Sequence, residues 1–156
     1  MTPAVNFLKK NSIKFTLHRY QHDADHPSYG LEAAEKLDLD PNLVFKTLVV
    51  QIEGKELVVA MVPVNRQLNL KSLARFLKVK KIGMADGKAV ESATGYILGG
   101  VSPLAQKKRL RTVIDETAAS CSTILISGGR RGLEIELGPD ELIRLCGAET
   151  GSISSS

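Results

Sequence analysis

Hydrophobic positions along the chain follow two different spacings. Residues 44–52 and 56–64 are rich in β-branched and apolar side chains, which is typical of buried strands. The Glu-Gly-Lys tripeptide at 53–55 predicts a tight hairpin that joins them. Between residues 70 and 77 the apolar positions instead repeat at i, i+3, i+4 and i+7, which predicts an amphipathic helix capped by Asn69.

The rest of the pattern predicts short helices and strands that interleave irregularly. Helices are expected at 3–11, 31–37, 86–93 and 140–146, and strands at 15–20, 81–84, 111–115, 123–126 and 133–137. This order predicts a single compact α+β domain with a mixed, mostly antiparallel sheet and short surrounding helices, rather than a doubly wound fold. We assign the domain to residues 1–149 and expect the small, polar segment 150–156 to be a disordered tail.

Composition excludes several classes of protein. The chain has 156 residues, no tryptophan and a net charge of +4. No segment reaches membrane-spanning length, and the first residues lack the apolar run of a signal peptide. Cys121 and Cys146 have no metal-ligand spacing, and nothing in the pattern requires a disulfide. We therefore expect a cytoplasmic protein without a membrane partner.

Basic residues gather in three clusters along the chain. They are the run 107–109 with Arg111, the lysines of 78–81, and the pair 130–131. Clusters on separate segments can converge in the fold as a surface that follows a phosphate backbone. The alternative is that they are separate solvated loops, and charge alone favours that alternative.

Lys46 stands out because its chemistry conflicts with its surroundings. Strand side chains alternate between faces, so Lys46 shares a face with Val44, Leu48 and Val50. A lysine on an apolar face costs free energy unless its ammonium finds acceptors or reaches water. Such a conflict is expected at a functional site, although a lysine near a strand end that reaches solvent would give the same pattern.

The chemistry of Lys46 depends on its partners, which the pattern leaves open. A desolvated amine could form a Schiff base, whereas a charged one could hold a phosphate or a carbonyl group. Glu134 and Glu136 share a strand face and either could pair with it, as could the hydroxyls of Tyr20 or Thr47. A neighbouring carboxylate would keep the lysine charged.

Two glycine-rich segments could present backbone amides to a ligand. Gly99-Gly100 precedes Ser102-Pro103, and Ser127-Gly128-Gly129 lies between two expected strands. Neither matches a phosphate loop or a dinucleotide fingerprint, and each could be a sharp turn only. Ser102 lacks the context of a nucleophile, because no elbow motif surrounds it and proline follows it.

A group of histidines and acids near the start of the chain could be drawn as a metal site. The residues are His18, His22, Asp23, Asp25 and His26. Their spacing matches no zinc pattern, so a solvated loop is favoured and no metal is expected.

Four segments together resemble the YbaK family, whose members are free-standing relatives of the editing domain of bacterial prolyl-tRNA synthetase. They are FKTL at 45–48, SATGYILGGVSPL at 92–104, QKKR at 106–109 and SGGRRGL at 127–133. The similarity runs in order from residue 1 to about 149, and the long match through the second and third segments is highly specific.

The resemblance implies a compact domain around a barrel-like sheet that removes cysteine from mischarged tRNA, chiefly Cys-tRNA(Pro), without a metal or organic cofactor. Lys46 matches the family's key residue. Expected substrate contacts are Tyr20, Thr47, Gly99, Gly100, Val101, Ser102, Ser127, Gly128 and Glu134, and expected tRNA contacts are Lys107, Lys108, Arg109, Arg130 and Arg131. Glu134 departs from the aspartate that is common at its position. The implied mechanism is attack by the substrate's own thiol, with prolyl-tRNA synthetase as a further partner.

Two other functions remain open at this point. One is a deacylase for another small amino acid, such as alanine on proline tRNA, which would differ in its pocket-lining side chains. The other is a binding module for tRNA or a synthetase without catalysis. Lys46 and both glycine turns argue against the second.

Overall fold

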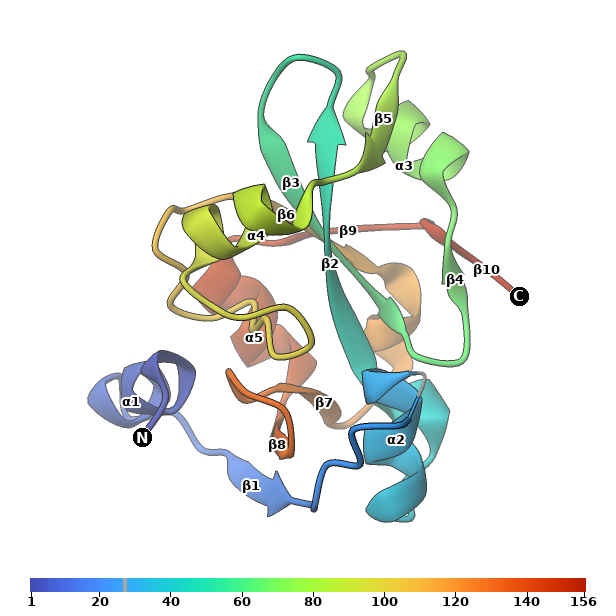
Figure 1. The fold of residues 1–156 in the computed structure, drawn as a ribbon. Helices are drawn as coiled ribbons and strands as arrows, with labels where there is room; N and C mark the ends of the chain where they lie inside the picture. Colours follow the sequence, from blue (N-terminus) through green and yellow to red (C-terminus); the bar gives the residue numbers. More distant parts are fainter. Residues whose placement is uncertain (27) are drawn as a thin grey trace.

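The computed structural model describes residues 1–26 and 28–156, and a mixed five-stranded sheet forms its centre (Figure 1). Across the sheet the strands are β5 (Ile82–Met84), β2 (Phe45–Ile52), β3 (Leu57–Pro63), β6 (Arg111–Asp115) and β9 (Glu149–Gly151). The predicted hairpin pairs β2 with β3 in antiparallel register, and β6 and β9 add to it in parallel.

The remaining strands form two smaller antiparallel sheets. One contains β1 (Thr16–Arg19), β8 (Leu133–Leu137) and β7 (Ile124–Ser127), and the other pairs β10 (Ser154–Ser155) with β4 (Gln67–Leu68). A single parallel bridge between Val44 and Leu125 links the three-stranded sheet to the central one. The mixed, mostly antiparallel α+β fold is confirmed, but the strands of the described residues do not close into a barrel.

Short helices surround the sheets, and their bounds follow local signals in the sequence. They are α1 (Pro3–Lys10), α2 (Tyr29–Lys36), α3 (Leu70–Leu77), α4 (Gly87–Thr94), α5 (Pro139–Cys146) and the 3-10 helices η1 (Pro41–Leu43) and η2 (Glu116–Ser120). Side-chain oxygens of Thr2, Ser28, Asn69 and Asp86 cap the first turns of α1 to α4. Gly147 ends α5 in the left-handed region at φ 60°, as expected for a glycine after a helix.

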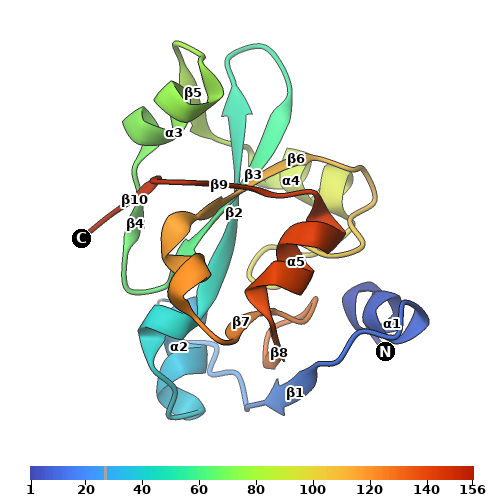
Figure 2. The ribbon, with the colours of Figure 1, turned by 180° about the vertical axis from the view of Figure 1, so that it is seen from behind.

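The two faces of the central sheet bury separate groups of side chains. Val49 and Ile114 belong to the larger cluster, which includes residues of α1, α4, α5 and the three-stranded sheet. Val50 and Val113 face the other way and pack with α3. Figure 2, seen from behind, shows α5 in front of the central strands. None of the described helices is long and apolar enough to cross a membrane.

The prediction of a disordered tail at 150–156 is wrong. β9 pairs with β6 and β10 pairs with β4, and the side chain of Ile153 between them is fully buried against the α3 side of the sheet. The backbone of Ile153 donates to Asp115 Oδ1 at 3.0 Å and accepts from the Asn69 amide at 2.7 Å. One apolar residue and these bonds outweigh the small, polar composition of the segment, so the domain includes it.

We expect Ile153→Ala to lower the free energy of unfolding by about 2–4 kcal/mol, because it removes a fully buried side chain and leaves a cavity. Urea unfolding of both proteins measures the difference. Ser152→Ala, at the exposed neighbouring position, is the control and should change little. Equal stability of Ile153→Ala and wild type would mean that the segment does not contribute to the core.

Candidate active site

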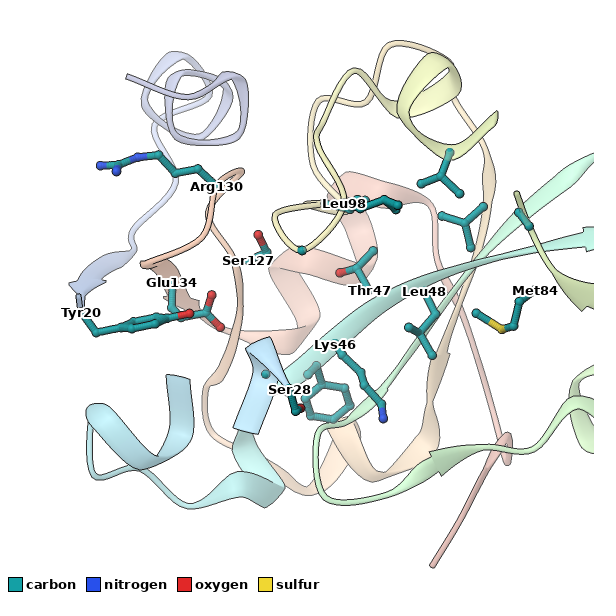
Figure 3. A pocket seen from close by; sticks show the side chains of 17 residues that line it. Tyr20, Ser28, Lys46, Thr47, Leu48, Met84, Leu98, Ser127, Arg130 and Glu134 are labelled. Carbon is teal, nitrogen blue, oxygen red and sulfur yellow. The ribbon is translucent and has the colours of Figure 1, made fainter. Parts of the chain in front are cut away.

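A cavity of about 350 Å³ opens along one edge of β2 (Figure 3). β5 pairs only with residues 50–52 of β2, and the chain then turns away into α4 through the bond from the Ala85 amide to Val49 O at 3.0 Å. At the other end Val44 bridges to β7. Among the described residues, the edge of β2 from Phe45 to Leu48 has no partner strand on this side. Backbone and side chains from both faces of β2 therefore reach the same cavity.

Lys46 lines this cavity and is half-buried. Its side chain lies on the same side of β2 as Leu48 and opposite Thr47, as the alternation predicted (Figure 3). Burial lowers the pKa of its ammonium group. In the described residues it forms no ion pair and no hydrogen bond, so neither Glu134 nor Glu136 is the partner that the sequence left open. Glu136 instead bonds His18 and Thr123.

Tyr20 and Glu134 form the polar end of the cavity (Figure 3). Glu134 is only 7% exposed, and burial raises its pKa to about 8, so its carboxyl group is largely protonated at neutral pH. Burial, with the nearby charge of Glu134, also raises the pKa of Tyr20 to about 12. The phenol of Tyr20 can donate a hydrogen bond. The carboxyl group of Glu134 can donate one when it is protonated and accept one when it is charged, so its charge depends on the ligand that binds.

A tight turn forms the wall opposite β2. The Gly100 amide donates to Ile97 O at 2.9 Å, and Gly99 has φ 88°, which favours glycine at this position of the turn. Gly99, Leu98 and Val101 from this segment all line the cavity. Ser127, at the end of β7, also lines it and its hydroxyl accepts from the Gly129 amide at 3.2 Å.

Thr47 provides an unusual polar atom inside the cavity. Its Oγ1 is buried and has no hydrogen-bond partner among the described residues. A buried hydroxyl without a partner costs about 1–3 kcal/mol. Because Thr47 is one of the residues that line the cavity, this hydroxyl lies close to the space that a ligand would fill.

A buried carboxylate fixes the segment that carries Tyr20. Burial alone would raise the pKa of Glu32, but bonds from His22, the Asp23 amide and Lys36 lower it to about 2. The distances to His22 Nδ1 and the Asp23 amide are 2.6 and 2.7 Å. Glu32 lies on α2, so these bonds fasten the chain after Tyr20 to that helix.

Three residues predicted to contact substrate are not part of the cavity. Ser102 is fully buried, and its hydroxyl accepts from the Leu104 amide at 3.3 Å. A Cβ on Gly100 would lie 2.7 Å from Arg130 Cα, so this glycine allows two backbones to pack closely. Gly128 packs against Leu133, and its carbonyl accepts from Thr2 Oγ1 at 2.5 Å. Gly100, Ser102 and Gly128 therefore contact other parts of the protein and not the space of the cavity.

The basic residues divide between two regions. Arg130 lines the cavity, and Arg131 donates to Leu98 O at 3.2 Å beside it. Lys108 and Arg109 line a different hollow near Cys146, and Lys107 packs next to Gly95. The 107–109 cluster therefore does not join the cavity, and a contact with tRNA by these three residues stays a prediction.

Sequence reasoning missed the apolar part of the cavity. Its further lining residues are Ser28, Gly30, Phe45, Leu48, Val49, Met84, Ala85, Val90 and Leu98. Most look like ordinary core positions in sequence, and Met84 looks like a strand end. The one available signal was the apolar pair Ile97-Leu98 within the glycine-rich segment.

The histidines near the start of the chain each pair with a different acid. His18 bonds Glu136, His22 bonds Glu32 and His26 bonds Glu35. Over residues 1–26 and 28–156, no group of three or more His, Cys, Asp or Glu side chains is arranged to hold a metal.

The fold is that of an aminoacyl-tRNA editing domain, as the matches to known proteins show. A family model described as "Aminoacyl-tRNA editing domain" matches residues 27–145, and the chain belongs to this family. A protein of Enterococcus faecalis named "Putative Cys-tRNA(Pro)/Cys-tRNA(Cys) deacylase EbsC" is 34% identical over 99% of this chain and 93% of that protein. The resemblance drawn from the four sequence segments is thereby confirmed.

Solved structures show the same fold over the whole chain. The crystal structure of hypothetical protein APE2540 matches with a TM-score of 0.86 and 25% identity, covering 98% of this chain and 99% of that one. A structure described as "a putative trans-editing enzyme for prolyl tRNA synthetase" matches with a TM-score of 0.83 and 21% identity, covering 99% and 96%.

Proposed function

We propose that this protein is a trans-editing enzyme that removes cysteine chiefly from mischarged Cys-tRNA(Pro), with the correctly charged Cys-tRNA(Cys) as a second substrate. The observation that carries the proposal is the half-buried Lys46, without a partner among the described residues, in a cavity that also holds a buried acid and a glycine turn. The family and the name of the Enterococcus faecalis relative support the substrate class.

The cavity provides positions for each part of an aminoacyl ester. Glu134 and Tyr20 at the polar end receive the α-amino group, whose pKa is ordinarily close to that of Glu134, so a proton can be shared between them. Lys46 holds the ribose-phosphate side of the ester. The N-terminal turn of α2 lies beside it, since a Cβ on Gly30 would be 3.9 Å from Lys46 Cβ. Gly99, in the opposite wall, faces the carbonyl oxygen.

The described lining residues contain no histidine or cysteine, which favours a mechanism that uses the substrate's own thiol. The thiol sulfur forms a bond to the ester carbonyl carbon and the bond from that carbon to the ribose oxygen breaks. The thiol proton passes to the ribose oxygen, so free tRNA leaves and the amino acid departs as a four-membered thiolactone that water later opens. The protein then needs only to orient the ester and stabilise charge.

This mechanism also explains selection without a finely shaped pocket. One methylene distinguishes substrates by only about 1–3 kcal/mol. Esters of alanine and serine lack a thiol, so they escape this route whatever their fit. The cavity can therefore admit several small amino acids and release only one of them quickly.

The test compares aminoacyl-tRNAs at protein concentrations far below that of substrate. We expect repeated turnover of cysteinyl-tRNA and little release from alanyl-, seryl- or prolyl-tRNA. Cysteinyl-tRNA with a methylated thiol should be stable if the thiol attacks. Release of the methylated residue at the normal rate would show ordinary hydrolysis, rapid release of alanine would favour the alternative deacylase, and binding without turnover would show a tRNA-binding module.

A further inference from the structure

Exposed apolar side chains gather at one end of the cavity. Within the described chain the large apolar residues that remain exposed are Met1, Met84, Ile97 and Leu98. Met84 and Leu98 line the cavity, and Ile97, at 76% exposure, precedes Leu98 in the same turn. We call Met84, Ile97 and Leu98 the apolar lip. Figure 3 places Met84 at the end of the cavity away from Tyr20 and Glu134.

Hydrogen bonds hold the turn that carries Ile97 and Leu98. The Leu98 amide donates to Glu91 Oε2 at 3.0 Å, and its carbonyl accepts from Arg131 at 3.2 Å. The Leu98 side chain packs so closely on the start of α4 that a Cβ on Gly87 would lie 2.7 Å from its Cδ1. The lip is thus exposed although its backbone is fixed from two sides, which is typical of a preformed contact surface and not of a loose loop.

The place of the apolar lip along the cavity indicates which part of the substrate it contacts. This step rests on the proposed function, in which the amino group lies at Glu134 and the ester lies near Lys46. The ester is attached to the ribose of the terminal adenosine, so the adenine base must lie beyond Lys46, on the side of Met84 and Leu98. A base has an apolar face that can pack on aliphatic side chains and on the polarisable sulfur of methionine. The single acid among the described lining residues, Glu134, lies at the other end.

We propose that Met84, Ile97 and Leu98 form a platform on which the terminal adenine of the aminoacyl-tRNA stacks, so that the ester is held over Lys46. The platform contacts the flat face of the adenine base and not its hydrogen-bonding edge. It therefore binds the end of any tRNA alike and contributes to substrate binding, not to the choice of amino acid.

The test uses Ile97, whose exposed side chain can be changed without opening the core. Ile97→Ser should raise KM for cysteinyl-tRNA about tenfold with kcat little changed, as expected when one apolar side chain that packs on the ligand is lost. Ile97→Leu keeps an apolar side chain and should restore most of the binding, and Lys55→Ala, outside the cavity, is the control that should keep the wild-type KM. With 2-aminopurine in place of the terminal adenine, wild type and Ile97→Leu should change the probe's fluorescence on binding, and Ile97→Ser should do so only at higher protein concentration.

The chain contains no tryptophan, so Ile97→Trp provides a second, independent signal. Its fluorescence should be quenched by tRNA that ends in adenosine and less by tRNA that lacks the terminal nucleotide. Equal quenching by both RNAs, or an unchanged KM in Ile97→Ser, overturns the platform. An effect of Ile97→Ser that appears only with prolyl-tRNA synthetase present overturns it too, in favour of a protein contact. If wild type binds the probe but never deacylates, the proposed function fails while the two fluorescence assays still decide the platform.

Discussion

Replacing Lys46 with methionine should lower kcat/KM for cysteinyl-tRNA by about 100-fold, the size of effect expected when the ester is no longer held in its reactive position. Methionine keeps most of the apolar side chain and removes only the ammonium group. The loss therefore reports the charge and not the packing of β2. Because an ion pair or hydrogen bond to Lys46 is absent from the described residues, no other side chain is left without its partner by the change.

The same substitution should leave the free energy of unfolding unchanged or raise it. Burial lowers the pKa of Lys46, which means that the fold disfavours its charged form. A residue that costs stability and yet occupies a cavity is expected to contribute to activity. Loss of activity together with retained stability is the combined outcome that the site predicts.

Two further variants separate the roles of charge and shape. Lys46→Arg keeps the charge with a larger, planar group, so we expect partial activity with a raised KM. Lys55→Ala removes a lysine from the hairpin between β2 and β3, outside the cavity, and should behave as wild type. Deacylation by Lys46→Met at the wild-type rate would show that the ammonium group is not part of the mechanism.

Local pattern predicted most of the elements because each has its own signal in sequence. Capping side chains at Thr2, Ser28 and Asn69 mark helix starts, and Glu53-Gly54-Lys55 marks the hairpin. The 150–156 segment has no such signal. Its order comes from one buried isoleucine and from pairing with β4 and β6, which depends on strands far away in the sequence.

The site was predictable where a residue conflicts with its surroundings and not where it agrees with them. Lys46 and Glu134 are charged residues in apolar strands, and both line the cavity. Leu48 and Val49 are typical residues of a buried strand, so the sequence did not indicate that they line the cavity. Ser102 was expected at the substrate because of the family resemblance, but it does not line the cavity and its hydroxyl bonds the backbone two residues on.

Glu134→Gln should stabilise the protein increasingly as the pH rises from 5 to 9. The pKa of Glu134 is raised from 4.5 to about 8 in the folded chain, so the folded state holds a proton that the unfolded state has released. Stability contributed by the neutral acid is fully present below pH 4.5 and is lost as the pH rises through about 8. Because a tenfold change in proton affinity corresponds to about 1.4 kcal/mol, the stability difference between variant and wild type should grow by about 4 kcal/mol over this range.

Urea unfolding at pH 5, 7 and 9 measures this difference. Glu149→Gln is the control. Hydrogen bonding to the always-charged Arg111 lowers the pKa of Glu149, so its titration lies below this range and the control should show no growing difference. Tyr20 stays protonated throughout because its pKa is about 12. A constant difference between Glu134→Gln and wild type across the range would contradict the buried neutral acid.

The same titration should appear in catalysis. A substrate ammonium beside Glu134 favours its charged form, so binding and loss of the proton from Glu134 support each other. The kcat/KM of wild type should therefore change with pH near 8, and Glu134→Gln should have a raised KM and lack this dependence. A pH change that is identical in both proteins would assign the titration to the substrate amine alone, and the carboxyl group would then act only through packing.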